Sequence, residues 1–322
     1  MPNRRNPAAG GRGYGNRSDT GGDLRDRTDL PWELPHAFLG LDEIASSFET
    51  ARAVILPIPY ETTTSWGGGT RGGPAAIVEA SRYLELYDQE FDREPAEVGI
   101  HTLPALELTR EGPAPAAAEL QAAYRRIIDE SGDRFVTGLG GEHSVSAPLI
   151  RAQAERAGRR ISVLQLDAHA DLRAQYEGSA NSHASAMARV LDHADVVGVG
   201  IRGVSTEEIE VARASDAVTL LFADDMWRDD TWMDRALDAL GDPVYITFDV
   251  DFLDPSLVPS TGTPEPGGGE WYPTLRFLRR VFRERTVLAA DVVELAPIPG
   301  LSAPDFLVAK LVYKMIGYRF FA

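Results

Sequence analysis

Three residues with metal-binding side chains stand at alternate positions directly after an apolar run. The run covers residues 163–166, and the three residues are Asp167, His169 and Asp171. Alternate side chains of an extended chain point to the same face, so two carboxylates and an imidazole converge there. Desolvation and mutual repulsion destabilise such a group unless a cation lies between its members. The alternative is a strand that ends in a polar turn, with Asp171 capping a following helix.

The same design occurs twice more in the chain. The strand-like run 244–248 leads into Asp249 and Asp251, and the run 135–137 leads into a glycine turn that contains His143. Functional sites of open α/β sheets lie at the carboxyl ends of the strands, so we expect these side chains to meet. Carboxylates and imidazoles without thiolates suit two divalent ions, and they suit Mn²⁺ better than a structural zinc site. The predicted metal ligands are His143, Asp167, His169, Asp171, Asp249 and Asp251.

The elements that must position these residues follow from the periodicity of the chain. Near-continuous apolar runs rich in Val and Ile are typical of strands that helices cover on both faces. Repeated strand–helix alternation predicts a mostly parallel sheet, hence a three-layer α/β/α sandwich of about eight strands. The strand-like runs are 54–58, 135–139, 161–166, 196–201, 218–222, 244–248 and 287–293. The expected helices are 74–86, 115–129, 145–157, 183–191, 206–214, 234–240, 274–283 and 305–316.

Composition narrows the class of protein. Residues 1–30 are rich in Gly, Arg, Asp, Asn and Ser, so we expect a disordered tail before a single domain over 31–322. The absence of cysteine excludes disulfides and thiolate ligands. The net charge of −17 argues against nucleic acid and is compatible with a small cationic partner, although a solvated acidic surface explains it as well. Without a long apolar span or a signal-peptide pattern, we expect a cytoplasmic protein with no membrane partner.

Taken together, the motifs resemble those of the ureohydrolases, a family that includes arginases and agmatinases. The similar stretches are Gly140-Gly141-Glu142-His143-Ser144, Asp167-Ala168-His169-Ala170-Asp171, Asp249-Val250-Asp251-Phe252-Leu253-Asp254-Pro255 and Asp291-Val292-Val293-Glu294. The loops 60–74 and 261–268 are similar as well, so the resemblance extends over residues 35–320. It implies an α/β/α fold, two Mn²⁺ ions, a homo-oligomer (trimer or hexamer), and hydrolysis of a guanidinium group to urea and an amine.

The resemblance also implies roles for single residues. Glu294 matches the carboxylate that binds the guanidinium, and His183 matches the histidine that exchanges protons near the mouth of the site. Asp171 is the expected proton donor to the departing amine. One ion is expected on His143, Asp167, Asp171 and Asp249, and the other on His169 with Asp167, Asp249 and Asp251. Glu142 departs from the family, which often has Asp there. Taken singly, Glu294 could equally be a salt-bridge partner and His183 a surface residue.

The loop 172–182 bears on the choice of substrate. Its sequence around Arg173 and Glu177 resembles microbial agmatinases more than arginases. We expect Glu177 to face the distal cation of agmatine, which would be converted to putrescine and urea. Arg173 leaves open a guanidino acid such as guanidinobutyrate, or arginine. Two other classes fit less well, because a non-catalytic binding protein would lack ligands and a di-metal phosphatase would need a basic clamp near the motifs.

Overall fold

Eight parallel strands form one sheet in the computed structural model, which describes residues 33–42 and 46–322. Their order is β2-β1-β3-β8-β7-β4-β5-β6, and each neighbouring pair is parallel. The strands are β1 (Ala53–Ile58), β2 (Ile100–Thr102), β3 (Phe135–Gly140), β4 (Ile161–Leu166), β5 (Ala194–Ile201), β6 (Val218–Phe222), β7 (Val244–Asp249) and β8 (Val287–Val293). This sheet confirms the predicted fold class. The expected tail 1–30 lies outside the described residues.

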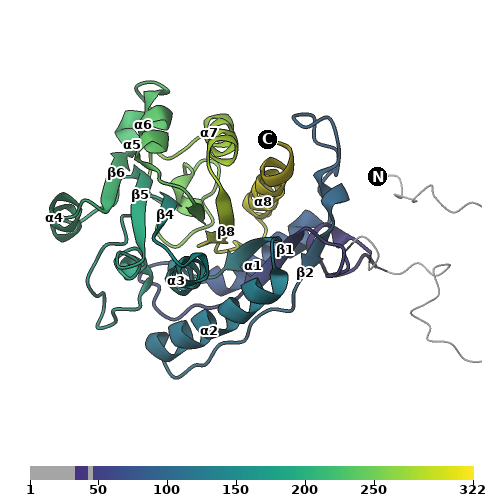
Figure 1. Ribbon diagram of the computed structural model, residues 1–322, viewed down its shortest axis with the longest axis horizontal. Coiled ribbons are helices and arrows are strands. Elements are labelled where there is room, and N and C mark those ends of the chain that lie inside the picture. Colours follow the sequence, from purple (N-terminus) through teal and green to yellow (C-terminus); the bar gives the residue numbers. More distant parts are fainter. Residues whose placement is uncertain (1–32, 43–45) are drawn as a thin grey trace, which may run out of the picture. The chain divides into compact units, whose positions relative to one another are not determined.

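Helices cover both faces of the sheet, as Figure 1 shows. One apolar cluster joins the sheet to α1, α6, α7 and α8, and a second joins its other face to α2 and α3. The helices are α1 (Gly73–Ser81), α2 (Pro113–Ser131), α3 (Ser146–Ala157), α4 (Thr206–Ala214), α5 (Ala223–Met226), α6 (Thr231–Ala239), α7 (Trp271–Glu284) and α8 (Ala303–Phe321). Because the inner strands are buried on both sides, their near-continuous apolar sequences are explained.

Three elements differ from the sequence-based prediction. The helix expected over 183–191 is wrong, because only a 3₁₀ turn (His183–Ser185) forms and irregular turns follow it. The N–H groups of Met187 and Ala188 both donate to Asp171 O, so contacts with a distant segment replace the helical ladder. The periodicity also missed β2 and α5, which have three and four residues and are too short to show a pattern.

The order of the strands brings the predicted site residues together. β3, β8, β7 and β4 are consecutive in the sheet and parallel, so their carboxyl ends share one edge. His143 follows β3, Glu294 follows β8, and Asp167 follows β4. Asp249 ends β7 and Asp251 lies in the 3₁₀ turn behind it. Residues up to about 150 positions apart in the chain therefore become neighbours at this edge.

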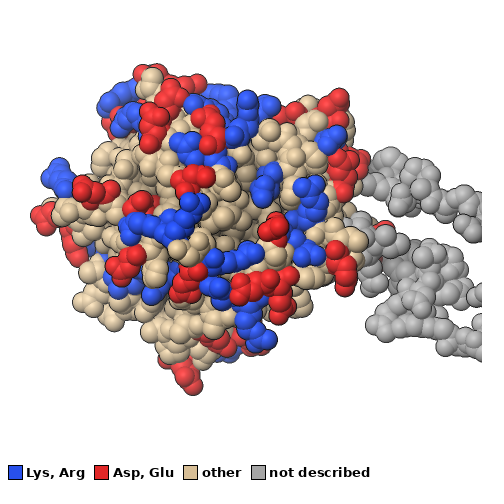
Figure 2. Space-filling model, viewed as in Figure 1, with Lys and Arg blue, Asp and Glu red and all other residues tan. Residues whose placement is uncertain are grey.

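The surface carries charges of both signs. On the face seen in Figure 2, Lys and Arg side chains are interspersed with Asp and Glu. This face therefore presents no extended basic surface of the kind that binds nucleic acid. Throughout the part of the chain that the structure describes, none of the helices has the length and apolar character needed to cross a membrane.

Candidate metal centre and active site

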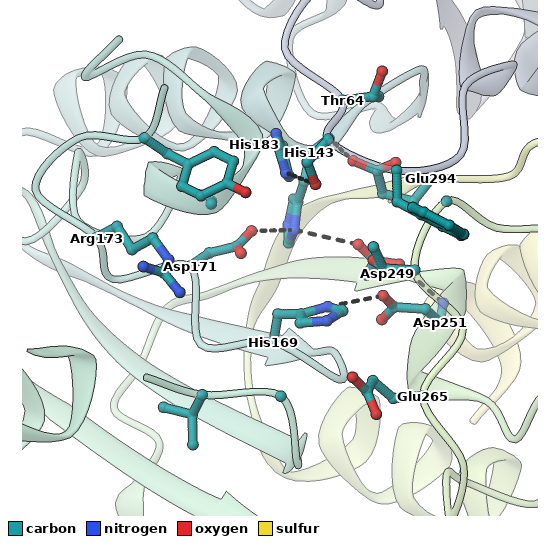
Figure 3. A pocket seen from close by; sticks show the side chains of 18 of the residues that line it. Thr64, His143, His169, Asp171, Arg173, His183, Asp249, Asp251, Glu265 and Glu294 are labelled. Carbon is teal, nitrogen blue, oxygen red and sulfur yellow. Dashed lines mark hydrogen bonds and ion pairs between the residues drawn. The ribbon is translucent and has the colours of Figure 1, made fainter. Parts of the chain in front are cut away.

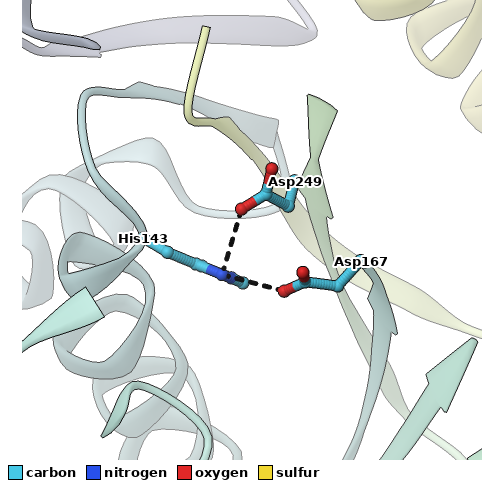
Figure 4. A group of neighbouring side chains, drawn as sticks. All are labelled: His143, Asp167 and Asp249. Atoms are coloured by element: carbon cyan, nitrogen blue, oxygen red, sulfur yellow. Dashed lines mark ion pairs between the residues drawn. The ribbon is translucent and has the colours of Figure 1, made fainter. Parts of the chain in front are cut away.

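His143 lies where three carboxylates meet. Its Nδ1 is 3.1 Å from Asp167 Oδ2, 2.9 Å from Asp171 Oδ2 and 3.5 Å from Asp249 Oδ2. All four residues are buried. Figure 4 shows that the carboxylates of Asp167 and Asp249 both face the ring. Because His143, Asp167 and Asp249 each offer a ligand atom within 4.8 Å of the others, they have the spacing of a metal site.

A second group shares Asp167 with the first. His169 Nδ1 is 3.0 Å from Asp251 Oδ2 and 3.7 Å from Asp167 Oδ1. Asp167, His169 and Asp251 also have the spacing of a metal site. The structure thus brings the six predicted ligands into one cluster, with Asp167 between its two halves. This arrangement supplies the residues of a binuclear metal site.

Backbone N–H groups orient the carboxylates. Asp167 Oδ1 accepts from His169 N at 2.6 Å, Asp249 Oδ1 accepts from Asp251 N at 2.9 Å, and Asp251 Oδ1 accepts from Ala168 N at 2.9 Å. The second oxygen of each carboxylate faces a histidine. Among the described residues, no Lys or Arg forms an ion pair with these three carboxylates. Their uncompensated negative charge fits a bound cation.

The hydrogen bond on the far side of His143 suits a metal ligand. His143 Nε2 lies 2.9 Å from Thr247 Oγ1, and the shorter donation from that hydroxyl goes to Asp291 Oδ1 at 2.7 Å. A hydroxyl has one proton, so Thr247 accepts from an N–H at Nε2. The lone pair of the neutral ring is then at Nδ1, a buried atom without a hydrogen bond of good geometry. An unpartnered nitrogen aimed at carboxylates fits a cation between them.

Without a cation, the cluster perturbs the acid–base equilibria of its members. Burial, followed by the charges of Asp251, Asp167 and Glu294, raises the pKa of Asp249 well above its ordinary value. Burial by itself lowers the pKa of His143, but the close approach and the negative charges of Asp167 and Asp171 outweigh burial and raise that pKa well above its ordinary value. The metal-free cluster therefore holds extra protons, which an incoming ion has to displace.

Two of the site carboxylates sit on unusual backbone. Asp171 and Glu294 have left-handed conformations with φ of 52° and 65°. Such a conformation costs a non-glycine residue about 1–3 kcal/mol and is concentrated at functional sites. Glu294 is held there by its N–H, which donates to Gly141 O at 2.8 Å, and by its Oε1, which accepts from His143 N at 2.6 Å. Both strained carboxylates point into the same space (Figure 3).

The cluster lines a cavity of about 250 Å³. Four predicted catalytic or substrate-binding residues line the same cavity: Asp171, Glu294, His183 and Arg173. Glu177 does not line it. Arg173 Nε lies 3.8 Å from Glu208 Oε2, and its guanidinium carbon is 5.3 Å from the centre of the Tyr176 ring. Glu177 is exposed, at a turn with φ of 48°. Three of the four residues predicted to bind substrate therefore reach the cavity.

Sequence reasoning missed several residues that support the site. Gln165 Nε2 donates to Asp167 Oδ2 at 2.8 Å, and Thr247 contacts His143 as described. Both lie two positions before a ligand on the same strand face, so strand alternation could have found them. Arg202 donates to Asp251 O at 2.6 Å and to Glu265 O at 2.8 Å, and Glu265 lines the cavity. No local pattern in the sequence marks Arg202, whereas Glu265 lies within the loop 261–268, whose resemblance to the family gave it no individual role.

Comparison with known proteins agrees with this geometry. Residues 51–317 match the Arginase family. An N(1)-aminopropylagmatine ureohydrolase of Synechocystis is 37% identical over 293 residues, which cover 88% of this chain and 94% of that protein. An agmatinase of Bacillus cereus is 35% identical over 257 residues, or 78% of this chain and 86% of that protein. The crystal structure of the agmatine ureohydrolase of Thermoplasma volcanium superposes with a TM-score of 0.78 at 26% identity, covering 92% and 97% of the two chains.

The chain belongs to the arginase family, and it is an agmatinase-type ureohydrolase, an enzyme that hydrolyses the C–N bond of a linear amidine. Both the family and the enzyme class confirm the prediction from the motifs.

Proposed function

We propose that this protein hydrolyses the guanidinium group of agmatine, or of an agmatine extended at its distal amine, to urea and the corresponding amine. The observation that carries the proposal is the buried cluster of His143, Asp167 and Asp249 beside Glu294 in one cavity. A guanidinium is a resonance-stabilised cation and a poor electrophile, so its hydrolysis needs both a strong nucleophile and an oriented substrate. The metal cluster would supply the nucleophile, and Glu294 would orient the substrate.

Two Mn²⁺ ions are the proposed cofactors. His143, Asp167, Asp171 and Asp249 would hold one ion, and His169 and Asp251 would hold the other together with Asp167 and Asp249. Carboxylates with imidazoles and no thiolate favour Mn²⁺ among the common divalent ions. When bound, such a pair would lower the pKa of a coordinated water molecule and so supply hydroxide near neutral pH.

Glu294 is the proposed anchor of the guanidinium. Its Oε1 accepts from His143 N at 2.6 Å, so Oε2 is the oxygen that can accept N–H bonds from the substrate. A charge-assisted pair with a planar cation fixes the orientation of that cation as well as its position. Because Glu294 is hydrogen-bonded to the turn that carries His143, it would hold the guanidinium carbon beside the metal cluster.

Two residues are proposed to handle protons. Asp171 Oδ2 reaches the cluster, 2.9 Å from His143 Nδ1, and also lines the cavity. It would take the proton of the attacking nucleophile and pass it to the departing amine. His183 lines the cavity and would exchange protons between the cavity and solvent, since an imidazole can both accept and donate a proton.

The rest of the cavity wall bears on the substrate tail. Glu265 lines the cavity, and its carboxylate has no ion-pair or hydrogen-bond partner among the described residues. It is better placed than the exposed Glu177 to bind a distal ammonium group. Arg173 is already near Glu208, at 3.8 Å, so a carboxylate on the substrate would have to compete for it. These contacts favour an amine tail over guanidinobutyrate or arginine.

A second candidate substrate is N(1)-aminopropylagmatine, whose tail carries an additional amine. Two observations favour it: the relatives of that name are up to 41% identical to this chain, and the Glu265 carboxylate in the cavity wall offers a partner for a second cation. The expected trimer or hexamer remains a prediction.

The test is a substrate panel assayed for urea. Purified protein with Mn²⁺ is compared with chelator-treated protein on agmatine, N(1)-aminopropylagmatine, guanidinobutyrate and arginine, and the substrates are ranked by kcat/KM. We expect urea from the first two, none without metal, and none from Asp249→Ala. Asp195→Ala, at an exposed position of β5, is the matched control and should keep full activity. Urea released at the normal rate by chelator-treated protein would refute the proposal.

A further inference from the structure

The hydroxyl of Thr63 connects a buried carboxylate to His183. Thr63 Oγ1 donates to Glu142 Oε1 at 2.7 Å. The same oxygen accepts from His183 N at 3.0 Å and lies 3.2 Å from His183 Nδ1. Glu142 is fully buried, and Thr63 comes from the loop after β1, 120 positions away from His183. The three residues thus form a chain of contacts from the turn after β3 to the wall of the cavity.

Glu142 acts only as a hydrogen-bond acceptor. Its Oε2 receives the N–H groups of Thr62 at 2.7 Å and Thr63 at 2.6 Å. Its Oε1 receives the hydroxyls of Thr63 at 2.7 Å and Ser144 at 2.5 Å. An ionised carboxylate has about four lone-pair sites, and these four donors fill them. The Thr63 hydroxyl therefore donates its one proton to Glu142.

The hydrogen bond from Thr63 to Glu142 determines which ring nitrogen of His183 carries the proton. A hydroxyl has one proton and two lone pairs, so Thr63 Oγ1 can only accept from both of its His183 contacts. One of them is the backbone N–H, and the other must then be an N–H at Nδ1. The opposite neutral tautomer would place a ring lone pair against an oxygen lone pair at 3.2 Å.

We infer that Glu142 and Thr63 are positioning residues that hold neutral His183 as its Nδ1–H tautomer, so that Nε2 is the nitrogen that gains and loses protons. Nε2 faces the open side, with Ser65 Oγ 3.5 Å away and exposed to solvent. Tyr176 packs its ring edge-on against His183 at 5.6 Å between centres. Asp171 and Arg173 line the same cavity as His183. The catalytic consequence rests on the proposed function, whereas the tautomer itself does not.

The tautomer is tested by ¹⁵N NMR of full-length protein labelled at histidine, with diamagnetic Zn²⁺ supplied in place of Mn²⁺. His183→Asn assigns the signal among the six histidines. We expect a protonated Nδ1 and an unprotonated Nε2 for neutral His183 in the wild-type protein. In Thr63→Val, which is nearly isosteric but lacks the hydroxyl, neutral His183 should shift toward the Nε2–H form. Thr63→Ser restores the hydroxyl and should restore the wild-type pattern.

The same variants separate positioning from simple structural damage. In the urea assay, Thr63→Val should lower kcat by roughly 10- to 100-fold with KM within about twofold, because proton exchange and not binding is impaired. Thr63→Ser should recover most of kcat. Thr219→Val, at an exposed position of β6, is the matched control and should change neither readout. An Nε2–H signal in wild-type protein, or an unchanged signal in Thr63→Val, overturns the inference even if urea is produced normally.

If the proposed function is wrong, the two experiments give a different combination of results. Absence of urea release by the wild-type protein would leave the NMR comparison intact, since the spectrum reports the ring directly. Thr63 is a better position for the test than Glu142, because Glu142 adjoins the proposed ligand His143 and its replacement would disturb both.

Discussion

Gly203→Ala should weaken metal binding without unfolding the protein. A Cβ at Gly203 would lie 2.6 Å from Cδ2 and 2.8 Å from Nε2 of His169, closer than such atoms can approach. Because ordinary contact begins at 3.4 Å, the ring would have to move by about 0.8 Å. The ring is partly exposed, with a relative side-chain accessibility of 26%, and can move, whereas the backbone of Gly203 is tied by its N–H to Ala168 O at 2.9 Å.

The magnitude follows from what metal ligands tolerate. A ligand distance departs from its ideal value by about 0.2 Å at most, so a shift several times larger removes His169 as an effective ligand or forces its shell to rearrange. We expect the affinity for the second ion to fall roughly 10- to 100-fold, or about 1.4–2.7 kcal/mol. The first ion, next to His143, should bind with nearly unchanged affinity.

The assay is calorimetric titration of metal-free protein with Mn²⁺, with urea release measured at each metal concentration. Activity of Gly203→Ala should be recovered in part by excess Mn²⁺. The control is Gly241→Ala, where the added methyl meets only Ser162 Cβ at 3.8 Å and no ligand. If Gly203→Ala binds two ions as tightly as wild-type protein does, the packing argument for His169 is wrong.

Three further predictions concern single carboxylates. Glu294→Gln should raise KM and lower kcat/KM by roughly 10- to 100-fold in the urea assay, because it removes the charge that pairs with the guanidinium; an unchanged kcat/KM would contradict that role. Glu265→Gln should raise KM for N(1)-aminopropylagmatine about 10-fold in steady-state kinetics and leave kcat unaltered. Asp88→Asn should destabilise the fold by about 1–3 kcal/mol in urea denaturation, because Asp88 Oδ1 accepts from the buried Lys314 Nζ at 2.7 Å. Burial raises the pKa of Asp88, but hydrogen bonds from Lys314 and from Glu90 N outweigh burial and lower that pKa. The ionised Asp88 therefore stabilises the fold above pH about 4, and this stabilisation is lost as the pH falls through the lowered pKa. The free energies of unfolding of wild-type protein and Asp88→Asn should then converge in acid.

Strand positions and ligand types could be predicted from the sequence. The runs before Asp167 and Asp249 are apolar and β-branched, and each leads directly into ligands at alternate positions. Both signals are local, since burial on two faces and alternation of side chains follow from a few adjacent residues. They were sufficient for the α/β/α class and for the family. The same locality explains the error over 183–191, where the apolar spacing is helical but the N–H groups bond to Asp171 O.

Only the tertiary structure decided how the site is supported. The adjacency of β3, β8, β7 and β4 places Glu294 against the turn of His143, and no local pattern specifies that order. Thr63 meets His183 across 120 positions, and Thr247 meets His143 across 104. A hydroxyl is an ordinary residue in a sequence; it determines the proton position of a histidine only when packing brings a buried carboxylate to its other side. The ligands of this protein are therefore determined locally, while their protonation and orientation are determined by contacts between distant segments.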